Sequence, residues 1–258
     1  MDILKKMRLD GKGIFVTGGA RGIGKACATA LAYAGANLAI VDIDIDEAKK
    51  TATDIAKQTG VKTIAIQTDV TKPEQVTAMV DQVVDELGKL DVAFCNAGIA
   101  MHAPAAEMAY EDWLKVIDIN LNGVFLCNQA AGRVMIKQKS GSIINTASMS
   151  ATVVNYPQPQ VSYNPSKAAV VMLTKCLAVE WAPYNVRVNS ISPGYIETEL
   201  IKQSKLLVPL IEQWTAVTPV RRMGSPEELT AICVYLAGDS SPYTTGSDFV
   251  IDGGFTCL

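Results

Sequence analysis

The sequence predicts an α/β protein in which helices cover both faces of a parallel sheet. Short runs rich in Val and Ile recur along the chain, longer segments with helical spacing separate them, and the runs are continuously apolar. Strands that alternate with helices form βαβ units. Continuous apolar character is typical of parallel strands buried on both faces. With 258 residues, of which 49% are hydrophobic, the chain is expected to form one domain over residues 1–258.

Seven apolar runs are expected to form the strands. They are Gly13–Thr17, Leu38–Asp42, Thr63–Gln67, Asp91–Cys95, Ser142–Thr146, Arg187–Ser192 and Asp248–Ile251. In the clearest helical segment, Val and Leu side chains from Val76 to Leu87 recur on one stripe. Longer helices are expected over Glu111–Lys137, Tyr163–Ala182 and Ser225–Ala237, the last of which opens with a Ser-Pro-Glu-Glu start signal.

One region interrupts this alternation of strands and helices. Residues 194–224 contain no clean strand and include Pro209 and Pro219. A connection of this length in a compact domain is usually functional, often as a lid over a site. The sequence leaves two interpretations open, a lid and a surface excursion with a short helix.

Composition and charge exclude several classes of function. Charged residues make up 19% of the chain and the net charge is −3, which lacks the basic footprint of a nucleic-acid binder. Gly, Pro and charged residues interrupt every apolar stretch before it reaches the length of a membrane span. The N-terminus lacks the apolar run of a signal peptide. We therefore expect a cytoplasmic protein with no nucleic-acid or membrane partner.

Cysteine and histidine usage argues against a metal site. The six cysteines include no Cys-x-x-Cys pair, and His102 is the single histidine. Zinc sites use clustered Cys and His ligands, so no metal is expected. The cysteines are expected to be reduced and to act as small buried hydrophobes. His102 is expected in a loop or at the rim of a substrate site.

A glycine-rich turn follows the first predicted strand. It runs from Gly18 through Arg21, Gly22 and Ile23 to Gly24 and leads into an amphipathic helix. Glycines at such a turn let backbone N–H groups approach a pyrophosphate, and the positive end of the helix dipole adds to the attraction. Glycines also serve ordinary tight turns. The strand before and the helix after favour a dinucleotide site.

Polar residues after the next strands extend this predicted cofactor site. Asp42 ends the second strand, where a carboxylate accepts both hydroxyls of an adenosine ribose and repels a 2′-phosphate. Arg21 favours a phosphorylated ribose, but the carboxylate is expected to dominate, which predicts NAD. Asp69, with Val70, is expected to reach the adenine amino group. A small turn beside the cofactor is formed by Asn96, Ala97 and Gly98.

Several motifs then occur in one order along the chain. They are Thr17-Gly18-x-x-x-Gly22-x-Gly24, Asn96-Ala97-Gly98, Ser148, Tyr163-x-x-x-Lys167 and Pro193-Gly194. Together they resemble the short-chain dehydrogenases/reductases over nearly the whole chain. The resemblance implies a Rossmann-type sheet of seven strands, an enzyme with a nicotinamide cofactor, and a homotetramer. We expect a cofactor half at about residues 10–100 and a catalytic and substrate half at about 101–258.

The resemblance assigns four catalytic residues. They are Asn120, Ser148, Tyr163 and Lys167. Tyr163 follows Ser148 by 163 − 148 = 15 positions, which is longer than the usual spacing. Ser150 is the alternative that would shorten the interval, but the distance of Ser148 from the fifth strand favours Ser148. Because proline is tolerated in the first turn of a helix, Pro165 indicates that Tyr163 lies near a helix start.

The pair of Tyr163 and Lys167 suits the oxidation of an alcohol. Tyrosine, with a pKa near 10, is a poor base at neutral pH, and a nearby ammonium lowers that pKa by stabilising the phenolate. Residues four positions apart share one face of a helix. The resemblance implies that Ser148 holds the substrate oxygen, Lys167 also binds the nicotinamide ribose, and Asn120 positions water for a proton relay. In reduction, Tyr163 donates the proton.

The turn after the sixth strand is expected to complete the cofactor site. It contains Pro193, Gly194, Ile196 and Thr198. Ligands of open α/β sheets bind at the carboxyl ends of the strands. The Ile196 backbone and the Thr198 hydroxyl are expected to bind the nicotinamide amide, although the segment also fits a plain loop turn.

The long loop after Ser148 carries the prediction of the substrate. Residues 148–160 resemble the sugar-alcohol members of the family, so we expect interconversion of a secondary alcohol, a polyol, with its ketose. Ser150, Asn155 and Gln158 are expected to contact the substrate, the last two through hydroxyls beyond the reacting carbon. In the alternative, Asn155 caps a turn and Gln158 faces solvent.

Three other functions stay open. A 3-oxoacyl reductase is disfavoured by Asp42, because that work usually prefers NADPH. Dehydrogenases of other secondary alcohols, including gluconate-like acids, are the second. The third, a catalytically inactive cofactor-binding protein, is disfavoured by the complete catalytic set.

Overall fold

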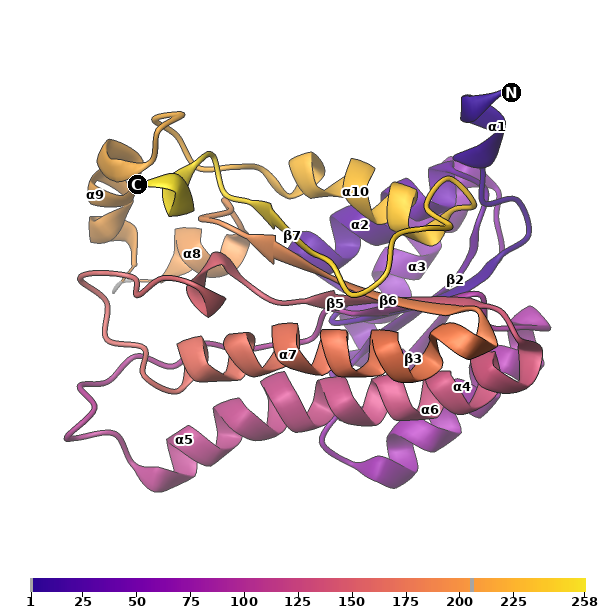
Figure 1. Ribbon diagram of the computed structural model, residues 1–258, viewed down its shortest axis with the longest axis horizontal. Helices are drawn as coiled ribbons and strands as arrows, with labels where there is room; N and C mark the ends of the chain where they lie inside the picture. The colour runs from indigo at the N-terminus through magenta and orange to yellow at the C-terminus, as the bar shows by residue number, and fades with distance from the viewer. Residues whose placement is uncertain (1, 205–206) are drawn as a thin grey trace.

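Seven parallel strands form one sheet with the order β3-β2-β1-β4-β5-β6-β7 (Figure 1). The structure, a computed structural model, describes residues 2–204 and 207–258, without the side chains of Leu200 and Lys202. The strands are β1 Gly13–Thr17, β2 Asn37–Asp42, β3 Thr63–Gln67, β4 Val92–Cys95, β5 Gly141–Thr146, β6 Val186–Pro193 and β7 Asp248–Ile251. The strand order reverses between β1 and β4, and ligands of such sheets bind at the carboxyl ends beside this point.

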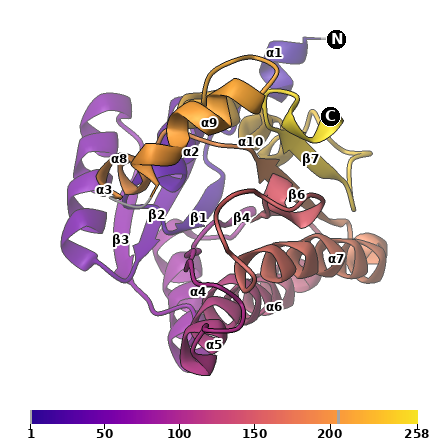
Figure 2. The ribbon, with the colours of Figure 1, turned by 90° about the vertical axis from the view of Figure 1, so that its left-hand side faces the viewer.

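Helices cover the sheet on both faces (Figure 2). One face carries α2 Gly22–Tyr33, α3 Ile45–Thr59 and α10 Thr230–Ala237. The other carries α4 Pro73–Leu87, α6 Gly123–Gln138 and α7 Tyr163–Trp181. Successive side chains of β1 enter opposite cores, since Phe15 packs with the second group of helices and Ile14 with the first. This arrangement confirms the predicted doubly wound, Rossmann-type sheet.

Local sequence signals set the ends of the helices. The Asp44 side chain accepts the Glu47 N–H at 3.2 Å at the start of α3. Pro73 opens α4, where its missing N–H costs nothing. Gly60 and Gly88 end α3 and α4 with φ of 75° and 80°, a conformation that glycine adopts without strain. The predicted strands agree with the observed ones to within one residue at each end.

The long helix predicted over Glu111–Lys137 is interrupted. The structure has α5 at Tyr110–Ile117, a π-helical turn at Asp118–Asn122, and then α6. The prediction of one regular α-helix was therefore wrong here. Within this turn the buried Asn120 amide bonds the backbone of Ile99. Side-chain spacing alone does not reveal such a turn, and π-helical turns are frequent at functional sites.

The helix predicted over Ser225–Ala237 begins with a different type of helical turn from the one expected. Its first turn, Pro226–Leu229, is a 3₁₀-helix, and α10 follows. Ser225 and Glu228 form a reciprocal capping box at its start. The capping signal was therefore predicted correctly, while the type of the first turn was not. Further short 3₁₀ turns occur at Met149–Ala151, Ala182–Tyr184, Val208–Leu210 and Phe255–Cys257.

The region predicted as a lid or surface excursion contains two short helices. These are α8 at Glu199–Gln203 and α9 at Ile211–Val217. An isolated bridge between Ile196 and Gly224 ties its two ends together. Lys205 and Leu206, which fall within the predicted lid, lie outside the described residues. At the other end of the chain a short helix, α1, spans Ile3–Lys6.

The described helices do not have the properties of membrane spans. None of them, over residues 2–204 and 207–258, is both long and apolar enough to cross a membrane.

Candidate active site

A cavity of about 190 Å³ opens at the carboxyl end of the sheet. Its wall includes the Ser148 and Tyr163 side chains together with Ser150, Asn155 and Gln158. His102 also lies on this wall, half-buried, and burial lowers the pKa of its imidazole. The cavity therefore brings the predicted catalytic hydroxyls and the predicted substrate-binding residues to one place.

Tyr163 and Lys167 lie on the first turns of α7. Tyr163 is the first residue of this helix, as the position of Pro165 predicted. The Lys167 ammonium lies 5.6 Å from the centroid of the Tyr163 ring. The Lys167 Nζ donates a hydrogen bond of 2.7 Å to the Thr146 carbonyl at the end of β5. This bond fixes the ammonium beneath the tyrosine, beside the sheet edge.

Burial controls the titration of both side chains. It raises the pKa of the Tyr163 phenol, and a hydrogen bond with the Ser148 hydroxyl partly opposes this rise. Burial lowers the pKa of Lys167 to about 8. The net pKa of Tyr163 is therefore raised in this structure and not lowered as predicted, because burial of the phenol has the largest effect on it and the opposing effect comes from Ser148.

Two serines connect the tyrosine to the substrate loop. Ser148 Oγ donates to Ser150 Oγ at 3.1 Å, and Ser150 Oγ donates to Asn155 Oδ1 at 2.5 Å. Ser148 Oγ in turn accepts the Ser150 backbone N–H at 3.1 Å. Because Ser148 is the serine whose hydroxyl bonds Tyr163, the geometry favours it over Ser150 as the catalytic serine.

Asn120 holds the loop behind Lys167. Its amide accepts the Ile99 N–H at 2.8 Å and donates to the Ile99 carbonyl at 2.9 Å. It also donates to Ser166 Oγ at 3.1 Å. A Cβ atom at Gly98 would lie 3.3 Å from both Asn120 Oδ1 and Lys167 Nζ, so glycine permits this close approach. The proton relay through water stays a prediction.

The glycine-rich turn fits a pyrophosphate group. Gly18 and Gly22 have φ of 60° and 53°. A Cβ atom at Gly24 would lie 2.1 Å from the Gly18 carbonyl oxygen, so only glycine lets α2 begin this close to β1. No side chain caps the N-terminus of α2, which leaves its first N–H groups available to an anion. Ile23, one residue into the helix, reaches the cavity wall.

Asp42 and Arg21 lie beside this turn. The Asp42 carboxylate accepts the N–H groups of Ala20 and Asp44 at 3.1 and 3.2 Å. Arg21 Nη2 bonds Asp44 Oδ2 at 2.8 Å, and its Nε lies 3.7 Å from a Glu47 oxygen. The backbone thus fixes the strand-end carboxylate, while two other carboxylates engage the arginine.

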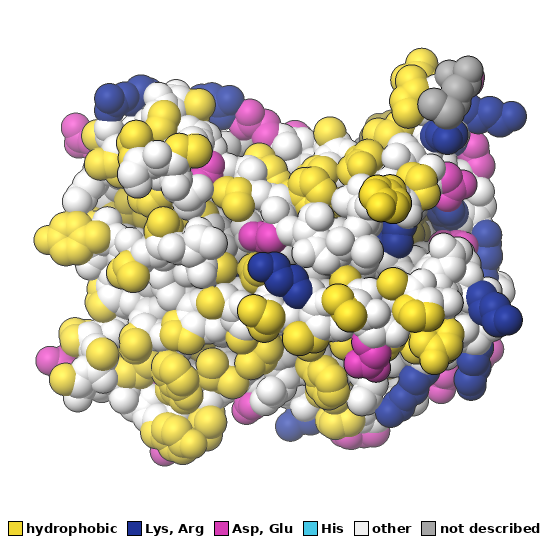
Figure 3. Space-filling model, in the orientation of Figure 1, with side chains coloured by type: hydrophobic (Ala, Val, Ile, Leu, Met, Phe, Trp, Pro, Cys, Tyr) yellow, Lys and Arg dark blue, Asp and Glu magenta, His cyan; other side chains and the backbone are white. Residues whose placement is uncertain are grey.

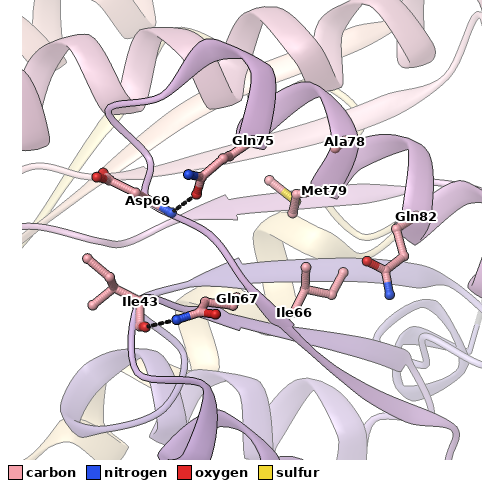
Figure 4. A pocket seen from close by; sticks show the side chains of 8 residues that line it. All are labelled: Ile43, Ile66, Gln67, Asp69, Gln75, Ala78, Met79 and Gln82. Carbon is pink, nitrogen blue, oxygen red and sulfur yellow. Dashed lines mark hydrogen bonds between the residues drawn. The ribbon is translucent and has the colours of Figure 1, made fainter.

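A hollow of about 490 Å³ lies between the end of β3 and α4 (Figure 4). Ile43 and Asp69 stand at one end of it. Asp69 Oδ1 accepts the Thr71 N–H and hydroxyl, and these bonds lower the pKa of the carboxyl group. Val70, next in the chain, is buried against Gly123. The predicted contact between Asp69 and adenine stays a prediction.

Asn96 ties two turns of the predicted cofactor site together. Its Nδ2 donates to the carbonyls of Thr17 and Gly18 at 3.1 and 3.2 Å. The Ala97 N–H donates to Thr17 Oγ1 at 3.1 Å. The loop after β4 therefore holds the glycine-rich turn in place.

The turn after β6 approaches the same place from the other side. Pro193, Gly194, Ile196 and Thr198 all line the cavity. A Cβ atom at Gly22 would lie 3.6 Å from Thr198 Cγ2, so this turn reaches across to the glycine-rich turn. The predicted cofactor residues thus surround one continuous edge of the sheet.

Tyr195 and Trp214 were missed by the sequence reasoning. The Tyr195 hydroxyl accepts hydrogen bonds from Asn155 Nδ2 and Gln158 Nε2, both at 3.1 Å. Its ring stacks on Trp214 with centroids 4.2 Å apart. Gln158 is buried, so the alternative in which it faces solvent is wrong. Tyr195 follows Pro193-Gly194 directly, which is the signal that could have drawn attention to it.

Candidate metal ligands do not cluster among the described residues. Over residues 2–204 and 207–258, no group of three His, Cys, Asp or Glu side chains is arranged to hold a metal ion.

Comparisons with known proteins place this geometry in a family. Residues 18–256 match a family model described as Enoyl-(Acyl carrier protein) reductase. Sorbose reductase SOU1 of Candida albicans is 42% identical, covering 99% of this chain and 91% of its own. Galactitol 2-dehydrogenase of Rhizobium johnstonii is 42% identical over 100% of both chains. NADP-dependent mannitol dehydrogenase of Hypocrea jecorina is 41% identical, covering 98% and 96%.

A solved structure agrees with these relatives. The crystal structure of a short-chain type dehydrogenase/reductase from Mycobacterium marinum is 47% identical, with a TM-score of 0.96 over 100% of both chains. The fold, the order of the motifs and the clustered Ser148, Tyr163 and Lys167 all agree with this similarity. The chain therefore belongs to the short-chain dehydrogenase/reductase family and is an oxidoreductase that acts on CH–OH groups.

Proposed function

We propose that this enzyme interconverts a polyol and its ketose, with NAD as the preferred cofactor. The observation that carries the proposal is the cavity wall, where the Ser148 and Tyr163 hydroxyls face the same space as Ser150, Asn155 and Gln158. A site built from several polar groups discriminates against substrates that leave those groups unpaired. The names of the relatives from Candida albicans and Rhizobium johnstonii refer to sorbose and galactitol, which supports this class of substrate.

The side chains divide the reaction between them. The bound nicotinamide supplies the hydride acceptor or donor. Ser148 donates a hydrogen bond to the reacting oxygen, and Tyr163 takes its proton in oxidation or returns it in reduction. The buried Lys167 ammonium, fixed by the Thr146 carbonyl, stabilises the phenolate that forms when Tyr163 loses its proton. Asn120 holds the loop at Ile99 and would position water behind Lys167 for a proton relay.

Asp42 supports NAD over NADP. Its carboxylate stands at the end of β2 beside the glycine-rich turn, where it would accept ribose hydroxyls and repel a 2′-phosphate. Arg21, the cation that could bind such a phosphate, is engaged by Asp44 and Glu47. One relative is named as NADP-dependent, so the preference is a property to be measured on this chain.

Steady-state kinetics with both cofactors test this preference. Wild-type enzyme is expected to have the higher kcat/KM with NAD, and Asp42→Asn is expected to narrow the gap because it removes the repelling charge. Asp46→Asn, nearby on α3, is the matched control and should leave the ratio unchanged. Equal or higher kcat/KM with NADP in the wild type would contradict the proposal.

We propose a homotetramer assembled through an apolar face. Hydrophobic side chains gather along the lower half of the view in Figure 3, over α5, α6 and α7. Exposed members on these helices are Leu114, Phe125, Met172 and Val179. Apolar patches of this kind mark protein interfaces.

The remaining expectations concern the halves of the chain, the lid and location. Residues 10–100 supply the glycine-rich turn and residues 101–258 the catalytic side chains, which supports the proposed division. Ile201, Leu207 and Trp214, from the predicted lid region, line the cavity. All six cysteines are free, which supports the proposed cytoplasmic location. Cys176 and Cys257 are exposed, so the expectation that the cysteines are buried was wrong for these two.

Product identification tests the substrate class directly. Incubation with NAD and a six-carbon polyol is expected to yield NADH and a ketose identifiable by NMR. Absence of polyol turnover, together with reduction of a 3-oxoacyl thioester, would overturn the proposal in favour of the lipid-synthesis alternative.

A further inference from the structure

The Tyr195 hydroxyl occupies an unusual position in the active-site cavity. A phenol hydroxyl has one donor proton and accepts up to two hydrogen bonds. Asn155 Nδ2 and Gln158 Nε2 each donate to the Tyr195 oxygen at 3.1 Å. Amide nitrogens can only donate, so both acceptor positions of the hydroxyl are filled. Its own proton must therefore be directed elsewhere, and no acceptor for it occurs among the described residues.

The two amides cannot reverse these bonds. Asn155 Oδ1 already accepts Ser150 Oγ at 2.5 Å and Gln160 Nε2 at 2.8 Å. Gln158 Oε1 accepts the indole Nε1 of Trp214 at 3.1 Å. Because an indole nitrogen is a donor in every state, it fixes the orientation of the Gln158 amide. At the other end, the Val153 carbonyl can only accept, and it accepts from Asn164 Nδ2 at 2.9 Å. Asn164 Oδ1 therefore faces Gln160 Nε2, which donates to Asn155 Oδ1, so the direction of the network is set at both ends.

Aromatic packing fixes the position of the same hydroxyl. The Tyr195 ring lies parallel to Trp214, with an interplanar angle of 7°. Phe255 meets the ring edge-on, at 5.4 Å between centroids and 90°. Tyr195, Asn155, Gln158 and Trp214 all line the cavity that contains Ser148 and Tyr163. The oxygen is therefore held in place and cannot swing away when substrate enters.

We propose that the Tyr195 hydroxyl is a fixed hydrogen-bond donor of the substrate cavity, which selects substrates that carry an acceptor oxygen beyond the reacting carbon. The inference rests on the proposed polyol activity and names the residue that distinguishes a polyol from a simple secondary alcohol. Burial raises the pKa of Tyr195 above its usual value. The hydroxyl accordingly keeps its proton across the neutral range and remains a donor. Asn155 and Gln158 act as positioning residues toward it, in addition to any contact of their own.

Tyr195→Phe removes the donor and preserves the aromatic packing. We expect kcat/KM for a six-carbon polyol to fall about tenfold or more, the range of one lost hydrogen bond in a desolvated site. The kcat/KM for 2-hexanol, which has no second oxygen, should stay within about twofold on the same reasoning. Tyr235→Phe is the matched control. Tyr235 lies on α10 and its hydroxyl bonds the Thr244 hydroxyl at 2.8 Å, so its loss should leave both kcat/KM values unchanged.

Gln158→Glu provides a second test with the ring hydroxyl intact. One oxygen of the new carboxylate still accepts from Trp214. The other takes the place of Gln158 Nε2, so that it accepts the Tyr195 proton and draws it away from the cavity. The polyol should again lose kcat/KM relative to 2-hexanol, while the Tm and NADH affinity show that the fold persists.

The outcomes separate this inference from the proposed function. Polyol turnover by the wild type tests the proposed function alone. If the wild type oxidises polyols but Tyr195→Phe lowers kcat/KM equally for both substrates, Tyr195 only shapes the site and the inference is wrong. Unchanged polyol kinetics in Tyr195→Phe would overturn it as well.

Discussion

At the scale of single residues, the active centre depends on two side chains that burial shifts in opposite directions. Lys167 is held at the Thr146 carbonyl and loses proton affinity, while Tyr163 gains it. The phenol therefore keeps its proton unless a neighbouring positive charge or hydrogen-bond donor lowers the free energy of forming the phenolate. Ser148, bonded to the phenol, opposes the rise in its pKa and faces the substrate cavity. In the proposed mechanism, these three groups together move a proton to or from the substrate oxygen.

The two serines can be separated by mutation. Ser148→Ala is expected to lower kcat by a factor of about 10²–10⁴, because it removes the hydroxyl that bonds both Tyr163 and the reacting oxygen. Ser150→Ala should act mainly on KM for polyols, since Ser150 bonds Asn155 on the substrate side. Initial-rate kinetics of the two variants decide the matter. Loss of kcat only in Ser150→Ala would show that the catalytic serine was chosen wrongly.

The low pKa of Lys167 predicts how stability depends on pH. The pKa of Lys167 is about 8 in the folded enzyme and 10.5 in the unfolded chain. Burial of the charged ammonium therefore lowers the free energy of unfolding by roughly 3 kcal/mol below pH 8. This cost disappears as the pH rises from 8 toward 10.5. The raised pKa of Tyr163 affects the free energy of unfolding only above pH 10. There the unfolded chain loses the phenol proton more readily than the folded enzyme, so the fold is destabilised.

Denaturant unfolding of the cofactor-free protein checks this prediction. Between pH 8 and 10, wild-type enzyme is expected to gain roughly 2 kcal/mol in the free energy of unfolding relative to Lys167→Met. The comparison uses the pH dependence alone, because the substitution also leaves the Thr146 carbonyl unpaired. Parallel curves for the two proteins would refute the burial of a titrating ammonium.

Sequence reasoning identified residues with a motif and missed residues defined by contacts. Tyr163 and Lys167 were predictable because their spacing and chemistry are local. Tyr195 was not, because its role depends on amides some forty positions earlier and a tryptophan on α9. The net pKa of Tyr163 was predicted in the wrong direction, since charge is visible in a sequence and burial of one hydroxyl is not.

At the scale of elements, the start of α2 is where packing and cofactor binding meet. Gly24 lies against the Gly18 carbonyl, so that the helix begins directly behind the glycine-rich turn. Asn96, from the loop after β4, donates to the same turn and fixes it from the other side. No side chain caps this helix end, so its first N–H groups remain available to an anion beside the turn.

Gly24→Ala tests this arrangement. The new methyl group would lie 2.1 Å from the Gly18 oxygen, so the turn or the helix must shift. We expect a loss of about 1–3 kcal/mol in stability and an NADH Kd raised about tenfold or more. Lys25→Ala, one position along α2, should change neither value greatly. NADH fluorescence titration and thermal unfolding give the two readouts, and wild-type affinity in Gly24→Ala would contradict the account.

The elements also show where sequence patterns stop being informative. Strands were predicted to within one residue because their apolar runs end at polar or glycine residues. The π-helical turn at Asp118–Asn122 was not predicted, because its side chains continue the helical spacing on both sides. Within the turn, Asn120 bonds the backbone of Ile99, a tertiary contact that the sequence pattern does not reveal.

At the scale of the whole molecule, the two layers of helices differ in what they leave exposed. Helices α6 and α7 carry apolar side chains on their outer surface as well as on the face toward the sheet, and α5 adds the exposed Leu114 beside them (Figure 3). Met172 and Val179, two turns apart on α7, are 58% and 79% exposed. Burial of such side chains in an interface stabilises an assembly by roughly 1–3 kcal/mol each.

Val179→Arg is therefore expected to weaken the assembly, because it places a charge in the apolar face. Sedimentation velocity should show a homotetramer for the wild type and smaller species for this variant. Tyr243→Arg, at a fully exposed site before β7, is the control and should leave the distribution unchanged. A wild-type monomer, or a tetramer indifferent to Val179→Arg, would contradict the proposed interface.

In the proposed enzyme, one cavity joins a proton-transferring centre to a wall that recognises several hydroxyls. This arrangement is tested most directly by measuring kcat/KM of the purified enzyme. Polyols and simple secondary alcohols are oxidised with NAD, and a 3-oxoacyl thioester is reduced with NADH. The same measurements are repeated with Tyr163→Phe. We expect the highest kcat/KM for a polyol. Tyr163→Phe should lose polyol turnover and still bind NADH. Comparable values for polyols and simple alcohols, or full polyol turnover by Tyr163→Phe, would contradict this expectation.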